Sequence, residues 1–533
     1  MRIDKVKIGG PQKKGFKNLN QFEIDLDQTK MHTVLLGQNA AGKSNFLEAL
    51  VIIFRDLDLR ENPSFYFEID YQCKNNTIRI RIIGDPDTSS GYEFFVNDME
   101  KPMTKAAFYR DKDAHLPKYV FSYYSGVSNR LLEHFDTHQN RFYKDLLDGK
   151  DEPMRPLFYA RLIHSHFVLL AFYGFGQENI DEFLEKYLNI VGLESILFVL
   201  KKPHWEKKKK TAFDFWGSKG VVRGFLDDLW QYALAPITTE ETVREDFNKH
   251  PKQEQLYLYV SNQEKLKKLA GQYETNTNFF KMLESTYISD LIQEVRVKVR
   301  KKNVDGHITF RELSEGEQQL LTVLGLMRFT KEQESLILLD EPDTHLNPLW
   351  KWQYMELLEK VVEKDESSQV IMTTHDPLVI GGLTREEIRI FASRQVKDEE
   401  TGKEREQIYT FEPDFDPKGL GVAGILTSEF FGLPATIDKE SYEDLKEKRE
   451  LEVLNRDGRL NKVQLERLQK LEVELSNISL DHTQRDPLYN RFVQAVYQNP
   501  DLKKPPVDLE ERRSQNEKMA SILKKLMDEE KAQ

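Results

Sequence analysis

Gly37-Gln-Asn-Ala-Ala-Gly-Lys43-Ser44 fits the pattern G-x-x-x-x-G-K-[ST], and it decides the fold expected for this chain. The loop follows a short apolar run, residues 32–36, which is typical of a buried strand. A segment with apolar residues at helical spacing comes next: Phe46, Leu47, Leu50 and Ile53. A strand, a glycine-containing loop and a helix in this order bind phosphate, because backbone N–H groups and the helix N-terminus point at the anion. The sequence therefore predicts a phosphate-binding loop in an α/β protein.

Two side chains of this loop carry the chemistry that the motif predicts. Lys43 would reach the β- and γ-phosphates as a point charge, and Ser44 would ligate Mg²⁺. A turn that matches by chance is the alternative, but the strand before the loop and the helix after it favour the functional interpretation. The candidate nucleotide-binding residues of the loop are Gly37, Asn39, Ala40, Ala41, Gly42, Lys43, Ser44 and Asn45.

An acidic pair ends a second apolar run in Leu336-Ile-Leu-Leu-Asp340-Glu341-Pro342. A strand that ends in a carboxylate would hold Asp340 beside the metal ion. Glu341, one residue later, would face the γ-phosphate and polarise the attacking water. On its own such a pair is often only the exit of a strand. Together with the phosphate-binding loop, it predicts hydrolysis of a nucleoside triphosphate with Mg²⁺.

A third motif, Leu313-Ser-Glu-Gly-Glu-Gln-Gln319, precedes the acidic pair. Ser314 at a helix start, with Gly316 two residues later, presents a hydroxyl and free N–H groups to an anion. Ser314 and Glu317 also form the pattern of a capping box, which only closes the helix N-terminus. Both interpretations can hold at once. The position ahead of Asp340 favours the phosphate contact, with Ser314, Gly316 and Glu317 as candidate residues.

Two shorter motifs complete the set. Asp343-Thr-His-Leu-Asn-Pro348 follows the acidic pair, and Thr373-Thr-His375-Asp376-Pro377 follows the next apolar strand. A lone histidine after a strand is more often structural than catalytic. His375, however, is expected at the C-terminal end of a strand, the edge where ligands bind in open α/β sheets.

The segments GQNAAGKSN, LSEGEQQ, LLDEPDTHLNP and TTHDP together resemble the motifs of ABC-type ATPases of the SMC, RecF and OLD-like group, in the family's order. The resemblance covers residues 1–124 and 295–435, and it implies a head-to-tail dimer with two ATP molecules between the subunits. The residues that would act within one subunit are Lys43, Ser44, Asp340, Glu341 and His375. The residues that would reach across the interface or couple the two sites are Ser314, Gly316 and Asp343.

The sequence departs from that family in three places. The family's Gln that helps to hold Mg²⁺ and water is absent from Phe121-Ser-Tyr-Tyr-Ser-Gly-Val-Ser-Asn129, so slow hydrolysis is expected. No long heptad array follows, so no coiled-coil arm is expected. No Glu…Asp-x-Asp set of a Toprim nuclease follows His375, and the acidic pair Asp414 and Asp416 is interpreted as a solvated loop. We therefore expect no nuclease site in this chain.

Residues 425–433, the charged stretch after them and Asp486-Pro-Leu-Tyr489 are similar to the ATPase subunit of Septu-type anti-phage systems (PtuA), also found beside some retrons. This resemblance implies an HNH nuclease partner that the ATPase controls, with DNA contacted through the complex. The alternative is a RecF-like clamp that uses ATP to close on DNA in repair, without a nuclease. A nucleotide-gated scaffold that barely hydrolyses ATP is a third hypothesis.

The order of elements predicts four parts. Strands interleaved with helices indicate an ABC-type ATPase head with a mixed α/β sheet, residues 1–124 and 295–435. Residues 125–294 have long helical patterns, with strands expected near 196–200 and 255–260, and are predicted to form an inserted, mainly helical domain. Residues 436–533, broken at Pro505-Pro506, are expected to form a helical extension, which either packs within the chain or docks a partner.

Composition limits the remaining classes of function. The 533 residues carry a net charge of −12 and one cysteine, Cys73, which cannot form an internal disulfide. No signal segment and no apolar run of about 18 residues are present, so a cytoplasmic protein without membrane contact is expected. DNA contact would need a local basic patch. Lys207–Lys210 is one candidate, unless it is a solvated loop; the other is the hairpin face Arg296, Lys298 and Arg300, unless it only protects a sheet edge.

Overall fold

The computed structural model describes residues 1–531 apart from several short segments. The residues outside the description are 27–28, 31, 98, 127, 151–155, 177, 208–209, 245, 303–306, 310–312, 331–333, 363–367, 398–403, 478–491, 493–494, 497–498, 503–508 and 532–533. They include Lys208 and Lys209, the turn at Asp305-Gly306, Asp486–Tyr489 and Pro505-Pro506. The chain divides into two compact units, Met1–Ile425 and Leu426–Gln533, so the division comes before residue 436, where we expected the extension to begin.

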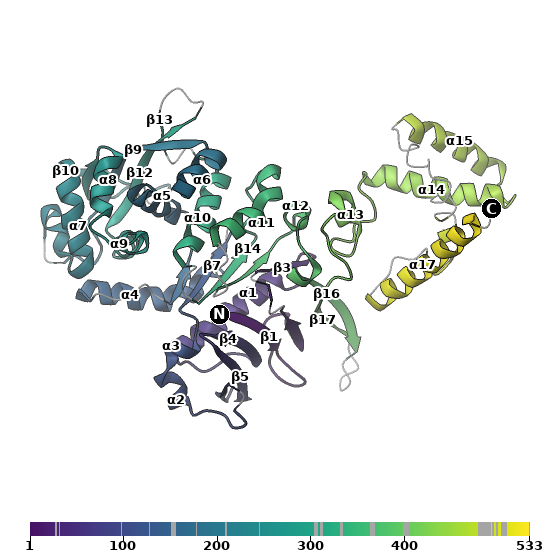
Figure 1. The fold of residues 1–533 in the computed structure, drawn as a ribbon, viewed down its shortest axis with the longest axis horizontal. Coiled ribbons are helices and arrows are strands. Elements are labelled where there is room, and N and C mark those ends of the chain that lie inside the picture. Colours follow the sequence, from purple (N-terminus) through teal and green to yellow (C-terminus); the bar gives the residue numbers. More distant parts are fainter. Residues whose placement is uncertain are drawn as a thin grey trace. The chain divides into compact units, whose positions relative to one another are not determined.

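A seven-stranded sheet forms the centre of the first unit, in the order β17-β16-β3-β15-β14-β7-β8 (Figure 1). Its strands are β3 (His32–Gly37), β7 (Tyr119–Tyr124), β8 (Leu157–Tyr159), β14 (Ser335–Asp340), β15 (Gln369–Thr373), β16 (Ile388–Lys397) and β17 (Glu404–Phe411). All neighbours run parallel except β16 and β17. Strands β14 and β15 are buried throughout, as expected of parallel strands covered on both faces. The predicted α/β fold with a mixed sheet is confirmed.

The phosphate-binding loop connects β3 to α1 (Lys43–Leu59), which packs on β3, β7, β14 and β15. The register of the parallel strands brings their C-terminal ends to one edge of the sheet. Asp340 pairs with Thr373 of β15 and with Tyr124 of β7, and Thr373 pairs with Leu35 of β3. The loop, the acidic pair and the segment that contains His375 therefore follow neighbouring strand ends.

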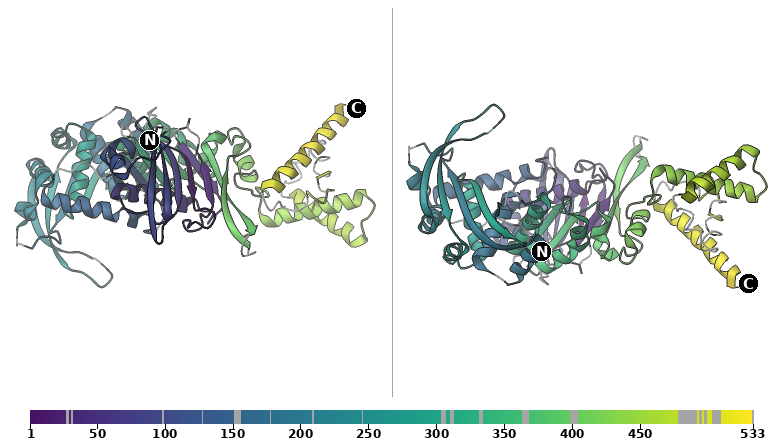
Figure 2. Two further views of the ribbon diagram at one scale, coloured as in Figure 1. Left: turned by 90° about the horizontal axis from the view of Figure 1, so that it is seen from below. Right: turned by 90° about the horizontal axis from the view of Figure 1, so that it is seen from above.

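A second, antiparallel sheet has the order β2-β1-β4-β5-β6; its strands lie side by side in the first view of Figure 2. They are β1 (Arg2–Ile8), β2 (Phe22–Asp25), β4 (Phe67–Cys73), β5 (Asn76–Asp85) and β6 (Ser89–Val96), followed by α2 (Lys105–Arg110) and α3 (Lys112–His115). Lys74 and Asn75, with φ of 47° and 66°, turn β4 into β5. This sheet shares one hydrophobic core with α1 and the head sheet.

The inserted region combines helices with a sheet of its own, in the order β10-β11-β9-β12-β13. Its elements are η1 (Leu132–Phe135), α4 (Asp136–Asp148), α5 (Ile163–Phe175), α6 (Glu178–Leu188), β9 (Ile190–Lys201), η2 (Ala212–Gly217), α7 (Gly220–Tyr232), β10 (Leu234–Thr242), β11 (Lys252–Val260), α8 (Gln263–Ala270), α9 (Asn276–Ile288), β12 (Ile292–Lys301) and β13 (His307–Thr309). Strands β9 and β11 occupy the stretches where strands were expected, whereas β10 was not foreseen, because it is mostly exposed and lacks an apolar pattern. Strand β12 runs past residue 294, where we expected the insert to end, because it pairs with β9 along its length.

Two helices of the head link the site to the inserted region. They are α10 (Glu315–Thr330) and α11 (Pro348–Val362), and α10 packs on both α11 and α5. The contact with α5 is close at Gly325, where an added Cβ would lie 2.1 Å from Cγ1 of Val168. Only glycine lets the two helix backbones approach this far.

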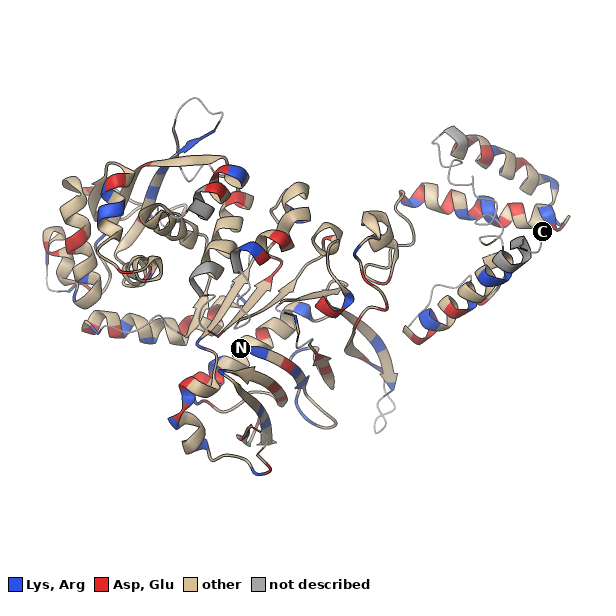
Figure 3. Ribbon diagram, viewed as in Figure 1, with Lys and Arg blue, Asp and Glu red and all other residues tan. Residues whose placement is uncertain are grey.

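The second unit contains three described long helices, α14 (Lys439–Arg456), α15 (Lys462–Asn477) and α17 (Leu509–Lys531). Helices α14 and α15 form the expected helical hairpin; α14 ends at Arg456, and the two helices share a core of Leu451, Leu468, Leu471 and Leu475. Ile478, expected in the same row, lies outside the described residues. Both signs of charge follow each other along α14 and α17 (Figure 3), and no residue of α17 with a described side chain is buried.

The expected basic face of β12 is exposed at Arg296, Lys298 and Arg300, and β12 pairs with β13 as a hairpin whose turn lies outside the described residues. Within the described part of the chain, no helix has the length and apolar character that crossing a membrane requires.

Candidate functional site

The phosphate-binding loop adopts a backbone that its glycines permit. Gly37 has a φ of 139°, and an added Cβ there would lie 2.4 Å from the carbonyl oxygen of Phe391. Gly42 is left-handed with a φ of 94° at the N-terminus of α1, and Ala40 also has a positive φ of 65°. The side chain of Asn18 donates a hydrogen bond of 3.0 Å to the carbonyl of Ala40 and so supports the loop from outside.

Lys43 lies across this loop. Its Nζ donates to the carbonyl oxygens of Gly37 at 2.7 Å and Gln38 at 3.1 Å. Burial lowers the pKa of Lys43 to about 8, although Glu341 and Asp340 oppose the shift. The ammonium group therefore has backbone oxygens as partners, and a bound phosphate would offer it an anionic partner instead.

Asp340 is fully buried at the end of β14. Oδ1 accepts hydrogen bonds from the hydroxyls of Ser44 at 3.0 Å and Thr373 at 2.7 Å, while Oδ2 has no partner among the residues that the structure describes. Burial raises the pKa of Asp340, because the hydrogen bonds do not offset the loss of water. A buried carboxylate oxygen without a partner, beside a serine hydroxyl, fits a hard divalent cation such as Mg²⁺.

The described residues hold no group of three or more His, Cys, Asp and Glu that could bind a metal ion by themselves. A Mg²⁺ ion at this edge would take Ser44 and Asp340 as two ligands and further oxygens from a nucleotide, since Mg²⁺ is usually held with substrate phosphates and water.

Glu341 and His375 lie next to each other at the same sheet edge. His375 Nε2 is 3.4 Å from Glu341 Oε1, and hydrogen bonding to His375 lowers the pKa of Glu341. Glu341 has a φ of 52°, a strained conformation for a residue with a side chain, and its N–H donates to the Thr373 hydroxyl. The carboxylate is partly exposed and ionised at neutral pH, so it can accept a proton or a hydrogen bond from a water molecule.

Asp343 is buried behind this pair. Its Oδ2 accepts a hydrogen bond of 2.9 Å from the hydroxyl of Thr374, next to His375 in the chain, and its Oδ1 has no partner. Burial raises the pKa of Asp343 to about 6. Asp376, in turn, pairs with Lys351 of α11 at 2.8 Å.

The start of α10 forms the predicted capping box. The N–H of Glu317 donates to the Ser314 hydroxyl at 3.2 Å, and the N–H of Ser314 donates to the Glu317 carboxylate at 2.8 Å. Gly316 lies against the segment after Asp343, where an added Cβ would be 2.5 Å from the carbonyl oxygen of His345. Within the described residues of one chain, no hydrogen bond joins Ser314 or Gly316 to the phosphate-binding loop.

A charged cluster beside the loop was missed by the sequence analysis. Glu48 on α1 is paired with Lys17 at 2.6 Å, Arg130 at 2.7 Å and His134 at 3.1 Å. Burial alone would raise the pKa of Glu48, but hydrogen bonds from these three residues outweigh it and lower the pKa to about 2. Arg130 also donates to the side chain of Asn45. No local motif marks these residues, because they are brought together only by the fold.

The segment after β7, in which the sequence has no Gln, stays close to the acidic pair. The N–H of Ser125 donates to the carbonyl of Asp340 at 3.2 Å, and its hydroxyl lies 3.2 Å from that of Thr344. The end of β7 thus remains attached to the end of β14 at the site.

Two family models match the chain in separate segments. The family described as an AAA ATPase domain matches residues 1–151. The family described as an AAA domain, putative AbiEii toxin of a type IV toxin–antitoxin system, matches residues 225–381.

Curated relatives match shorter stretches. Septu protein PtuA of Bacillus mycoides is 28% identical over 174 residues, which are 31% of this chain and 23% of that protein. The cell division ATP-binding protein FtsE of Streptococcus pneumoniae is 32% identical over 92 residues, 17% of this chain and 38% of that protein. The matches therefore span less than half the length of each relative.

Solved SMC heads are similar at low identity. The SMC head domain from Thermotoga maritima has a TM-score of 0.32 and 14% identity, over 78% of this chain and 100% of that one. An SMC head with an extended coiled coil, from Pyrococcus furiosus, has a TM-score of 0.32 and 14% identity, over 77% of this chain and 96% of that one. The matches to the two ATPase family models and to PtuA confirm the predicted resemblance to ATPases, PtuA among them.

Proposed function

We propose that this chain binds ATP with Mg²⁺ at the head site and hydrolyses it slowly. The observation that carries the proposal is the buried, unpartnered Oδ2 of Asp340, which lies next to the Ser44 hydroxyl and the phosphate-binding loop. Bound Mg²⁺ would neutralise charge on the phosphates. Backbone N–H groups of residues 37–45 bind the phosphates, and Lys43 moves its ammonium group from loop carbonyls to them.

Glu341 is the proposed acceptor for the attacking water. Its lowered pKa keeps the carboxylate ionised, and the strained backbone fixes it beside His375. His375 holds the orientation of that carboxylate and can donate a hydrogen bond to the γ-phosphate. The segment after β7 lacks the Gln that helps to position the attacking water in the family. The water therefore has one positioning group fewer, and for this reason we expect slow turnover.

Hydrolysis assays test this proposal. We expect Glu341→Gln to bind ATP but to hydrolyse it at least about 100-fold more slowly, because the water loses its acceptor. Glu264→Gln, an exposed glutamate of α8, is the control and should match the wild type. Equal turnover by Glu341→Gln and the wild type would contradict the proposed role and favour a scaffold that barely uses hydrolysis.

A dimer would complete the site. Ser314 and Glu317 cap α10, Gly316 lies against His345, and no hydrogen bond between described residues joins the three to the phosphate-binding loop of their own chain. We infer that two chains associate head to tail, with this helix start on the partner's γ-phosphate and Asp343 between the two sites. Light scattering of Glu341→Gln with ATP and Mg²⁺ should give a dimer or a larger assembly, and Ser314→Arg should stay monomeric.

The match to PtuA supports the biological setting that we propose: a cytoplasmic anti-phage complex, of Septu or retron type, in which nucleotide state controls an HNH nuclease subunit. DNA would be contacted through that complex. A pull-down of tagged Glu341→Gln from the native host, with ATP, Mg²⁺ and DNase, should recover a stoichiometric second protein. Deletion of residues 505–533 should release it if the tail docks the partner. Recovery of DNA alone, when DNase is omitted, would favour the RecF-like clamp instead.

A further inference from the structure

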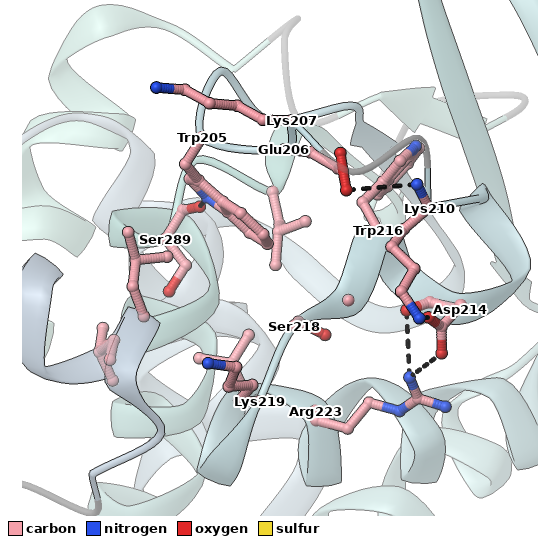
Figure 4. A pocket seen from close by; sticks show the side chains of 15 residues that line it. Trp205, Glu206, Lys207, Lys210, Asp214, Trp216, Ser218, Lys219, Arg223 and Ser289 are labelled. Carbon is pink, nitrogen blue, oxygen red and sulfur yellow. Dashed lines mark hydrogen bonds and ion pairs between the residues drawn. The ribbon is translucent and has the colours of Figure 1, made fainter.

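The inserted region contains a cavity of about 560 Å³, far in sequence from the head motifs (Figure 4). It lies where the end of α4, the segment after β9, η2, the first turn of α7 and the link from α9 to β12 meet. Its size falls within the range of about 300–1,000 Å³ that is typical of small-molecule sites. None of its lining residues takes part in the proposed ATP chemistry.

Two indole rings form one side of this cavity, in the upper half of Figure 4. Trp205 is half-buried, and its Nε1 donates to the carbonyl of Ser289 at 2.8 Å. Trp216 is fully buried, and its Nε1 donates to Glu254 at 3.1 Å. The ring of Trp205 is therefore fixed by a hydrogen bond at its edge and, being half-buried, offers a face to a flat, aromatic ligand, whereas the ring of Trp216 is covered and supports the wall of the cavity.

Ser218, Lys219 and Arg223 lie on the opposite side, in the lower half of Figure 4. Lys219 is exposed at the N-terminus of α7, and no described carboxylate pairs with it. The helix start has no side-chain cap, so its first N–H groups remain available to an anion. Next to it, the buried Oγ of Ser218 has no hydrogen-bond partner in the described part of the chain. A phosphate group would satisfy all three.

The charged side chains around the cavity give it a net positive charge. Arg223 and Lys210 both pair with Asp214, at 2.8 Å and 3.4 Å, and hold that carboxylate at the edge. Lys207 adds a further exposed cation. This cluster stands out in a chain whose net charge is −12. The loop that carries Trp216 also has three successive residues with positive φ, from Phe215 to Gly217, a strained backbone that packing must hold in place.

We propose that this cavity is a second ligand site, which binds a nucleoside phosphate with the base against Trp205 and the phosphate at Ser218, Lys219 and the start of α7. The ligand is either a free mononucleotide or the phosphorylated terminal nucleotide of an oligonucleotide. The proposal is independent of ATP hydrolysis in the head.

The test uses the full chain with Lys43→Ala, which removes the lysine of the head site, and measures AMP binding by calorimetry and by tryptophan fluorescence. We expect one AMP per chain, and binding of adenosine weaker by about tenfold or more, because a charge-assisted phosphate contact is lost. No AMP binding to the Lys43→Ala chain, or equal binding of AMP and adenosine, would overturn the proposal.

Substitutions at the cavity locate the bound AMP. Lys219→Glu should weaken binding by about tenfold or more, whereas Lys249→Glu, an exposed lysine that does not line the cavity, should leave it unchanged. Trp205→Phe should bind better than Trp205→Leu, because it keeps an aromatic face. Unchanged binding by Lys219→Glu and by Trp205→Leu would place the ligand elsewhere and overturn the proposal.

The two sources of the ligand are separated with a 5′-phosphorylated trinucleotide and its 5′-hydroxyl counterpart. Tighter binding of the phosphorylated trinucleotide than of AMP, with loss in Lys219→Glu, would support a nucleic-acid terminus. Binding of AMP with exclusion of both trinucleotides would support a free mononucleotide. Equal binding of both trinucleotides would contradict the phosphate contact.

Discussion

In the head, the candidate ATP-binding and Mg²⁺-binding residues come from short continuous motifs, and most of their polar atoms already have partners within the chain. In the inserted region, the cavity draws its residues from four separate stretches of the chain, and its hydroxyl, its helix start and two of its lysines have no described partner. The comparison shows that a site built from residues adjacent in the sequence can be predicted from the sequence, whereas a site whose residues only the fold brings together cannot.

Asp340→Asn gives the largest expected effect. Loss of the charge that would hold Mg²⁺ should reduce ATP hydrolysis on the order of 100-fold or more. Because burial raises the pKa of Asp340, the charged side chain costs stability in the free protein, and the variant should not melt at a lower temperature. A fall in melting temperature together with activity would indicate a structural role instead.

Two glycines, one in each region, test how tightly the helices pack. Gly325→Ala in α10 should lower the free energy of unfolding by about 1–3 kcal/mol, because the new Cβ meets Val168 of α5. At Gly224 in α7 a new Cβ would meet open space, so Gly224→Ala should raise the free energy of unfolding by about 0.5–1 kcal/mol. Chemical denaturation measures both. If adding Val168→Ala restores the stability that Gly325→Ala loses, the contact between α10 and α5 is confirmed. Equal changes in stability for Gly325→Ala and Gly224→Ala would contradict it.

Asp343 predicts a pH dependence of stability. Its pKa is raised from 3.8 to about 6 in the folded chain, so the folded state holds the proton more tightly than the unfolded state. The stabilisation that the protonated Asp343 contributes to the folded state is complete below pH 3.8 and is lost as the pH rises through 6. Asp343→Asn should therefore be more stable than the wild type by about 3 kcal/mol at pH 7, and nearly equal to it at pH 4. A constant difference across this range would contradict the assignment.

The smallest expected effect connects the two regions. Lys219→Glu should leave ATP hydrolysis within about twofold of the wild type, because distant sites without shared partners act independently. A larger change, measured in the presence of AMP and absent without it, would mean that the cavity and the head are coupled.

Much of the head follows from its sequence. The run before Gly37 is buried in β3, the run before Asp340 is buried in β14, and His375 follows β15, because parallel strands covered on both faces require continuous apolar residues. The capping box at Ser314 is equally local.

The rest depends on contacts that local patterns do not encode. Strand β10 is exposed and polar, and it is a strand because it pairs with β11. Glu48 and Arg130 are far apart in the chain, and only the fold of α1 against the segment after β7 joins them. The cavity in the inserted region was not predicted for the same reason: Trp205 and Lys219 carry no spacing that links them.

Binding of Mn²⁺ as a substitute for Mg²⁺, followed by electron paramagnetic resonance, tests the central claim most directly. With ATP present, the wild-type chain should bind one Mn²⁺ per head, and Asp340→Asn and Ser44→Ala should lose most of that signal while remaining folded. Equal Mn²⁺ binding by Asp340→Asn and the wild type would show that the buried oxygen of Asp340 is not a metal ligand and would contradict the account of the site.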